Sequence, residues 1–183
     1  MIAFVSGGAR SGKSAQAEAL AMRWHRARGG RLYYLATARA TDGEMIRRIS
    51  RHRETRGSGW TTLEEPVDLM AALDQVVPGS TLLLDCLTLW ASQVLYGSGL
   101  DERQGLAMID TMLSRARARN IALVVVSNDV NEEVPPRDAE VRRYLAFLQR
   151  LHRRVAHEAE LAIQVVAGLP MYWKGSGKEG EAQ

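Results

Sequence analysis

An octapeptide with the pattern of a phosphate-binding loop, Gly7-Gly8-Ala9-Arg10-Ser11-Gly12-Lys13-Ser14, directly follows the apolar run Ile2-Ala3-Phe4-Val5. Glycines let the backbone fold around an anion so that its N–H groups converge on phosphate oxygens. Lys13 adds a positive charge, and the Ser14 hydroxyl can bind Mg²⁺. The pattern predicts a strand, the loop and then a helix over about 14–26, whose positive dipole end faces the same phosphates. A chance glycine turn is the alternative, but the flanking segments favour a site for a nucleoside triphosphate.

A second short apolar run, Thr81-Leu82-Leu83-Leu84, ends in Asp85. It predicts a buried parallel strand that brings the carboxylate to the C-terminal edge of the sheet. In phosphate-binding-loop proteins an acid at that place holds Mg²⁺. The alternative is that Asp85 caps a helix that begins after Cys86.

Composition limits the class of protein. With 183 residues and 46% hydrophobic content, the chain suits a single α/β domain, expected over residues 1–173, with a polar, glycine-rich and disordered tail over 174–183. The lone Cys86 excludes an internal disulfide and a thiolate zinc site. No leader pattern opens the chain and no apolar run approaches membrane-spanning length, so we expect a cytoplasmic protein. Because 24 basic residues face 21 acidic ones without an aromatic-basic stripe, nucleic acid is not an expected partner.

Strand and helix patterns alternate along the chain. The predicted strands are Ile2–Ser6, Leu32–Ala36, Trp60–Leu63, Thr81–Asp85, Ile121–Ser127 and Leu161–Ala167. This order predicts a doubly wound, mostly parallel sheet with helices on both faces. Such sheets bind ligands beyond the carboxyl ends of their strands. That edge would carry the Gly7–Ser14 loop, Ala36–Ala38, Glu64, Asp85 and Ser127–Asp129.

A basic helix is predicted over residues 43–56. Thr41 and Glu44 have the spacing of a capping box, and the run Gly57-Ser58-Gly59 supplies a stop. Its periodicity turns His52 toward the body of the protein. That histidine could be a nucleophile or a phosphate contact, although residue chemistry alone favours a solvated helix with an ordinary half-buried histidine.

Considered together, these residues resemble the bifunctional adenosylcobinamide kinase/adenosylcobinamide-phosphate guanylyltransferase family of cobalamin biosynthesis. The resemblance covers most of the chain, and the order and spacing of its short segments make it specific. The segments are Val5–Ser14, Tyr34–Ala38, Asp42–Met45 with His52, Trp60–Pro66, Leu83–Thr88, Val126–Asp129 and Gly168–Pro170.

The resemblance implies roles for particular residues. In the family a helix histidine becomes guanylylated, and His52 corresponds to it, which favours the nucleophile over the solvated helix. The resemblance also implies nucleotide contacts from Gly7, Gly8, Ala9, Arg10, Ser11, Gly12, Lys13 and Ser14, from Ala36, Thr37 and Ala38, from Arg53, Glu54, Thr55 and Arg56, and from Glu64 and Asp85. Within that set, Ser14 and Asp85 would serve Mg²⁺.

The implied enzyme phosphorylates adenosylcobinamide on its aminopropanol hydroxyl, with GTP or ATP as the donor. It then transfers GMP from GTP, through the histidine, to adenosylcobinamide phosphate, and gives adenosylcobinamide-GDP. The resemblance further suggests a homotrimer. Two other classes stay open: a small-molecule kinase in which His52 is structural, and a nucleotide-gated binding module without turnover.

Overall fold

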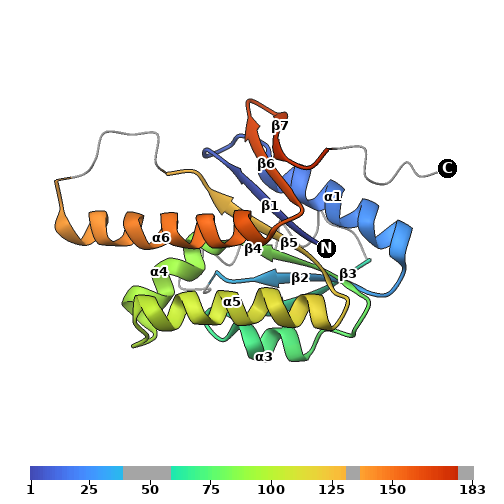
Figure 1. The fold of residues 1–183 in the computed structure, drawn as a ribbon, viewed down its shortest axis with the longest axis horizontal. Helices are drawn as coiled ribbons and strands as arrows, with labels where there is room; N and C mark the ends of the chain where they lie inside the picture. Colours follow the sequence, from blue (N-terminus) through green and yellow to red (C-terminus); the bar gives the residue numbers. More distant parts are fainter. Residues whose placement is uncertain (39–58, 131–136, 177–183) are drawn as a thin grey trace, which may run out of the picture.

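The structure is a computed structural model of the chain and describes residues 1–38, 59–130 and 137–176. Its described strands form one seven-stranded sheet in the order β3-β2-β4-β5-β1-β6-β7 (Figure 1). All neighbouring strands are parallel except the last pair, β6 and β7. The strands are β1 (Ile2–Gly7), β2 (Leu32–Ala36), β3 (Trp60–Glu64), β4 (Thr81–Asp85), β5 (Ala122–Asn128), β6 (Leu161–Val166) and β7 (Leu169–Lys174).

The described helices cover both faces of the sheet, which confirms the predicted fold class. They are α1 (Lys13–Arg28), α3 (Leu69–Asp74), α4 (Leu87–Gly97), α5 (Glu102–Ala118) and α6 (Ala139–Glu158). Helix α1 packs on one face, and the other four lie on the opposite face (Figure 1). None of them has both the length and the apolar character that crossing a bilayer would need. The helix predicted over 43–56 lies outside the described residues.

Strand β5 shows how the sheet divides two cores. Val124 and Val126 pack in the cluster that contains α1, whereas Leu123 and Val125 pack in the cluster under α3–α6. All four side chains are at most 1% exposed. A strand with both faces buried has no polar side to show, which explains its continuous apolar run.

Strand β7 was not predicted. It follows β6 through a two-residue turn in which Ala167 and Gly168 have φ of 50° and 83°. Positive φ at both positions is typical of the tight turn that joins antiparallel strands. Most side chains of β7 are exposed, and Pro170 interrupts its pattern, so the segment lacks the apolar alternation that identifies a strand.

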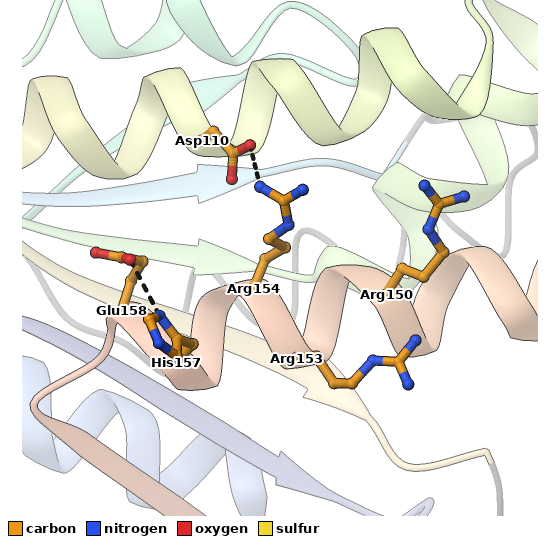
Figure 2. Close-up of a pocket in the computed structure, with 6 residues that line it drawn as sticks. All are labelled: Asp110, Arg150, Arg153, Arg154, His157 and Glu158. Atoms are coloured by element: carbon orange, nitrogen blue, oxygen red, sulfur yellow. Dashed lines mark hydrogen bonds and ion pairs between the residues drawn. The ribbon is translucent and has the colours of Figure 1, made fainter.

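The outer helices α5 and α6 are joined by charge pairs. A hollow of about 570 Å³ lies at these helices. Figure 2 draws the residues that line it: Asp110, Arg150, Arg153, Arg154, His157 and Glu158. Arg154 contacts Asp110 at 2.5 Å, and Arg150 contacts Glu102 at 3.2 Å. Pairs of this exposure contribute little to stability, on the order of 0–1 kcal/mol each. The hollow contains none of the residues predicted to bind nucleotide.

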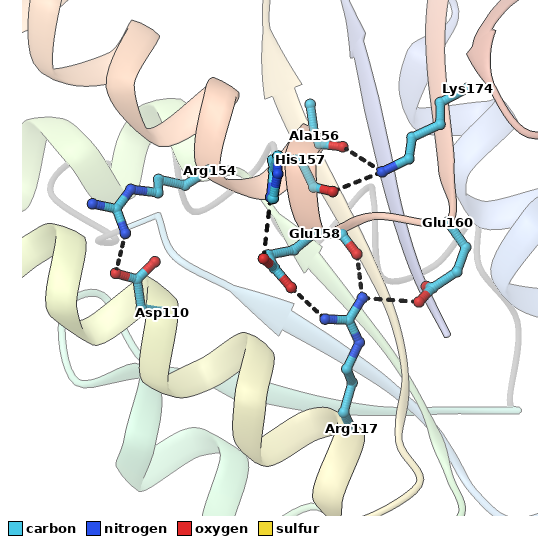
Figure 3. Close-up of polar contacts among 8 residues, drawn as sticks. All are labelled: Asp110, Arg117, Arg154, Ala156, His157, Glu158, Glu160 and Lys174. Atoms are coloured by element: carbon cyan, nitrogen blue, oxygen red, sulfur yellow. Dashed lines mark hydrogen bonds and ion pairs between the residues drawn. The ribbon is translucent and has the colours of Figure 1, made fainter.

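The end of α6 is held by two cations (Figure 3). Arg117 of α5 contacts the carboxylates of Glu158 and Glu160. The Lys174 ammonium donates to the carbonyl oxygens of Ala156 and His157 at 3.3 and 2.6 Å, which satisfies two acceptors of the last helical turn. The prediction of a disordered tail over 174–183 is therefore wrong at Lys174, which is the last residue of β7. Residues 177–183 lie outside the described part of the chain.

Gly105 gives a test of packing on the α3–α6 side. It lies in α5, where a Cβ atom would come within 2.7 Å of Phe147 Cζ and 3.0 Å of Val94 Cγ1. Alanine is normally about 1 kcal/mol better than glycine in a helix. Here we expect Gly105→Ala to lower the free energy of unfolding by about 1–3 kcal/mol, because Phe147 is fully buried and cannot move freely. Chemical denaturation would measure the change.

The control is Ala107→Gly at an exposed position of the same helix, which should show the ordinary loss of about 1 kcal/mol. In a Phe147→Leu background the Gly105→Ala change should destabilise less. A stabilising Gly105→Ala in the unaltered chain would contradict this packing.

Candidate active site

The predicted site residues at the strand ends that the structure describes lie along one edge of the sheet. In register, Ala36 at the end of β2 lies beside both Glu64 of β3 and Asp85 of β4. Gly7 at the end of β1 lies beside Asn128 of β5. Parallel strands place all these residues at the carboxyl edge, as the sequence predicted.

The phosphate-binding loop connects β1 to α1. A Cβ on Gly7 would lie 2.5 Å from Ser11 Oγ and 2.6 Å from the Val165 carbonyl oxygen, so only glycine fits there. The Lys13 ammonium donates to the Gly8 carbonyl at 3.1 Å, which places this cation against the loop. Ser11 Oγ is buried, and it has no hydrogen-bond partner in the part of the chain that the structure describes. A tight loop that presents a cation and an unused hydroxyl suits an anion.

Two neighbouring segments fix this loop. The Asp129 N–H donates to the Gly7 carbonyl at 2.9 Å, and the Gly168 N–H donates to the Ser11 carbonyl at 2.8 Å. Gly12 has φ of 91°, and its missing Cβ would lie 3.4 Å from Gly168 Cα. The β6–β7 turn therefore supports the loop from the side, a contact that sequence reasoning missed because it missed β7.

Asp85 is held by a tyrosine. The Tyr34 hydroxyl donates to Asp85 Oδ2 at 2.6 Å, and the two residues lie on neighbouring strands. Helix α4 has Cys86 as its N-cap, with no side-chain cap hydrogen bond, so the alternative in which Asp85 caps this helix is wrong. Tyr34 was missed as a site residue; the only signal was its place in the segment Tyr34–Ala38.

Thr37 fastens the ends of β2 and β4 together. Its hydroxyl donates to the Cys86 carbonyl and accepts from the Cys86 N–H, both at 2.9 Å, and its own N–H donates to the Asp85 carbonyl at 3.1 Å. The side chain of Gln93 donates to the Thr37 carbonyl. Thr37 is fully buried, so it fixes the backbone that carries Asp85. This role could not be read from the sequence.

The remaining predicted residues are less informative. Glu64 is exposed at the end of β3, and it shares its register partner, Ala36, with Asp85. His52, Arg53, Glu54, Thr55 and Arg56 lie outside the described residues.

A buried hydrogen-bond chain runs from α6 to the site edge. His152 Nε2 lies 2.7 Å from Ser127 Oγ, which lies 2.9 Å from Thr88 Oγ1. Thr88 Oγ1 accepts the Asn128 N–H at 2.7 Å. In one arrangement of these contacts, Thr88 donates to Ser127 and Ser127 donates to an unprotonated His152 nitrogen. Sequence reasoning missed this chain, whose members are far apart in sequence.

The histidine of this chain is kept neutral. Burial lowers the pKa of His152 to about 4, and the charge of Asp129 opposes the shift only in part. Its ring also lies against Phe4, with ring centroids 5.1 Å apart. A neutral ring is the form that can accept the hydroxyl of Ser127.

This pKa predicts a pH-dependent stability. The folded pKa lies below the ordinary value near 6.5, so the unfolded chain binds the proton first as the pH falls. Titration of His152 should therefore have no effect on the free energy of unfolding above about pH 7. It should lower that free energy progressively between about pH 6.5 and 4. The slope should approach about 1.4 kcal/mol per pH unit.

The measurement is the unfolding free energy of the wild type minus that of His152→Gln, followed from pH 7.5 to 4.5. This difference removes the titration of all other groups. On acidification this difference should fall, because only the wild type loses stability through His152. A difference that is constant with pH would contradict a depressed pKa. The exposed His157 offers a control, since His157→Gln should leave most of the pH dependence unchanged.

Known proteins share this fold, and some of them are similar to this chain in sequence. Two solved structures match at a TM-score of 0.54: a KaiC-like protein of Pyrococcus horikoshii at 11% identity, covering 89% of this chain and 69% of that one, and the flagellar accessory protein FlaH of Methanocaldococcus jannaschii at 12% identity, covering 100% and 81%. These likenesses support a fold of the phosphate-binding-loop NTPase type.

Sequence relatives are more specific. A protein of Pseudomonas aeruginosa named bifunctional adenosylcobalamin biosynthesis protein CobP is 41% identical, over 93% of this chain and 96% of the relative. The Escherichia coli protein named bifunctional adenosylcobalamin biosynthesis protein CobU is 29% identical, over 92% and 97%. The family model described as cobinamide kinase / cobinamide phosphate guanyltransferase matches residues 3–173. The chain therefore belongs to the cobinamide kinase / cobinamide phosphate guanyltransferase family.

Proposed function

We propose that the protein phosphorylates adenosylcobinamide and then converts adenosylcobinamide phosphate to adenosylcobinamide-GDP. The observation that carries the proposal is that Lys13, beside the phosphate-binding loop, and Asp85, at the end of β4, lie at the same edge of the sheet. The description of the family names both activities. The kinase-only alternative is not favoured, because the matching family pairs a kinase with a guanyltransferase and the relatives are named bifunctional.

In the kinase step, the aminopropanol hydroxyl attacks the γ-phosphorus of the triphosphate. The bond to the β-phosphate oxygen breaks, the nucleoside diphosphate leaves, and the hydroxyl proton passes to water. The chain's contribution is to position the phosphates and to offset their charge. Lys13 and the N–H groups of the Gly7–Ser14 loop are suited to this, since the loop is fixed by the β6–β7 turn and by Asp129.

Asp85 and Ser14 would hold Mg²⁺. Both supply oxygen, the donor that Mg²⁺ prefers. Tyr34 occupies Asp85 Oδ2, and among the described residues neither Asp85 Oδ1 nor the Ser14 hydroxyl has a protein hydrogen-bond partner. No group of three or more acidic, histidine or cysteine side chains forms a metal cluster in the described ranges, which suits an ion that takes most of its ligands from phosphate and water. When bound, the ion would neutralise charge that develops on the phosphates.

In the transferase step, a neutral nitrogen of His52 attacks the α-phosphorus of GTP. The bond to the β-phosphate oxygen breaks and pyrophosphate leaves, so that a phosphoramidate remains on the histidine. An oxygen of the substrate phosphate then attacks the same phosphorus and the P–N bond breaks. Two displacements let one site process two large substrates in turn. Support for His52 comes from the family resemblance and from its predicted helix.

The first test concerns a shared phosphate site. Lys13→Ala should lower both activities by a factor of about 100 or more, since the lost charge stabilises each transition state by about 3 kcal/mol. Lys174→Ala is a matched control, because it removes the same charge at the opposite edge of the sheet. Steady-state rates of both reactions would be compared. Near-normal guanylylation by Lys13→Ala would contradict a single site.

The second test concerns the nucleophile. Intact-mass analysis after GTP and Mg²⁺ should show a GMP adduct on the wild type. The adduct should be lost in mild acid and survive alkali, as a phosphoramidate does. His52→Asn should abolish the adduct and spare the kinase step, which does not use this nitrogen.

His157→Asn is the control, since this exposed histidine lies on α6 beside Glu158. Label retained by His52→Asn, or mapped to His25, His152 or His157, would contradict the assignment. A wild type that forms no adduct but still phosphorylates adenosylcobinamide would support the kinase-only alternative.

A further inference from the structure

Asn128 lies beside the phosphate-binding loop, at the end of β5. Its register partner is Gly7, the first residue of the loop, and β5 separates the strand that carries the loop from the strand that carries Asp85. Side chains alternate along β5, and Val124 and Val126 face the α1 cluster. Asn128 therefore points to the face on which the loop enters α1.

The polar groups of Asn128 divide into fixed and available ones. Its backbone N–H donates to Thr88 Oγ1 at 2.7 Å. Its side-chain amide forms no hydrogen bond with any residue in 1–38, 59–130 and 137–176, and the residue is only partly exposed. The backbone is held in place, while the amide is presented at the loop without a partner.

Asn128 is supported from the other face of the sheet. Thr88 is joined to Ser127 at 2.9 Å, and Ser127 to His152 at 2.7 Å. The Tyr144 hydroxyl, also from α6, donates to the Thr88 carbonyl at 3.0 Å. Ser127 is fully buried and Thr88 nearly so. Polar groups that are buried and mutually satisfied fix geometry, because breaking one bond leaves another group unpaired.

We propose that the Asn128 side-chain amide donates a hydrogen bond to the terminal phosphate of the bound nucleoside triphosphate, and that the chain Thr88–Ser127–His152 positions it. The proposal rests on the proposed function, since it requires a triphosphate in the loop. Asn128 is the residue that touches the ligand, and His152 acts only through Ser127 and Thr88.

The terminal phosphate is favoured by the position of the lysine. In phosphate-binding loops the backbone N–H groups hold the inner phosphates, and the lysine reaches the β- and γ-phosphates. Lys13 contacts Gly8, one residue beyond the register partner of Asn128. The amide and the ammonium thus meet the same end of the triphosphate. A neutral NH₂ group can donate to phosphate there without adding charge.

The test compares triphosphate and diphosphate binding. The probes are the α,β-methylene analogue of GTP, which cannot transfer GMP, and the matching diphosphate analogue, each measured by calorimetry with Mg²⁺. Asn128→Ala should weaken the triphosphate about tenfold or more and the diphosphate less than about twofold. Asn128→Asp should weaken the triphosphate further, because a carboxylate repels phosphate. The matched control is Gln75→Glu, which makes the same charge change at the exposed end of α3.

The supporting chain has its own readout. His152→Leu removes the acceptor for Ser127 and should lower the ratio of triphosphate to diphosphate affinity about threefold or more. His152→Gln, whose side-chain oxygen can accept the same hydrogen bond, should keep most of that ratio. A purely structural role would lower the melting temperature of both variants without moving the ratio.

The outcomes separate this inference from the proposed function. Equal weakening of both probes by Asn128→Ala would overturn the terminal-phosphate contact, and so would no weakening at all. Either result, with GMP labelling of the wild type intact, leaves the proposed function standing. A wild type that binds neither probe would overturn both. If Asn128→Ala does not fold, as judged by circular dichroism, Asn128→Ser in the same assay decides the matter.

Discussion

The parallel pairing of β1 with β5 is the constraint on which the site depends. It sets Gly7 beside Asn128, and the bond from the Asp129 N–H to the Gly7 carbonyl continues the pairing into the loop. A shift of one residue would turn every side chain of β5 to the other face. Val124 and Val126 would then leave the α1 cluster, so the burial of two valines fixes where Asn128 points.

The parts predictable from sequence were those with local or periodic signals. The Gly7–Ser14 loop has a fixed spacing, and Thr81–Asp85 is a continuous apolar run, so both the site edge and Asp85 could be placed. The sheet order follows less directly. Alternating strands and helices indicate a parallel sheet, but they do not show that β5 lies between β1 and β4.

The parts that sequence could not supply come from contacts between distant segments. Tyr34 reaches Asp85 because two strands pair in one register, and His152 reaches Ser127 because α6 packs over β1 and β5. Neither residue has a motif of its own. Strand β7 was missed for a different reason: as an exposed edge it has no buried face to impose a period on its sequence.

Polar residues at this edge fall into two groups with different physical tasks. Thr37 and Ser127 are fully buried, and their hydroxyls form hydrogen bonds with neighbouring protein atoms. Removing water from such groups is unfavourable unless every hydrogen bond is replaced, so they tolerate little movement. Lys13 and Asn128, partly exposed, lie above them with groups that a phosphate can use. Because the buried hydroxyls hold the strand ends in place and the donors of Lys13 and Asn128 are already positioned, a triphosphate can bind with little rearrangement of the strand ends. Binding free energy can then contribute to charge stabilisation.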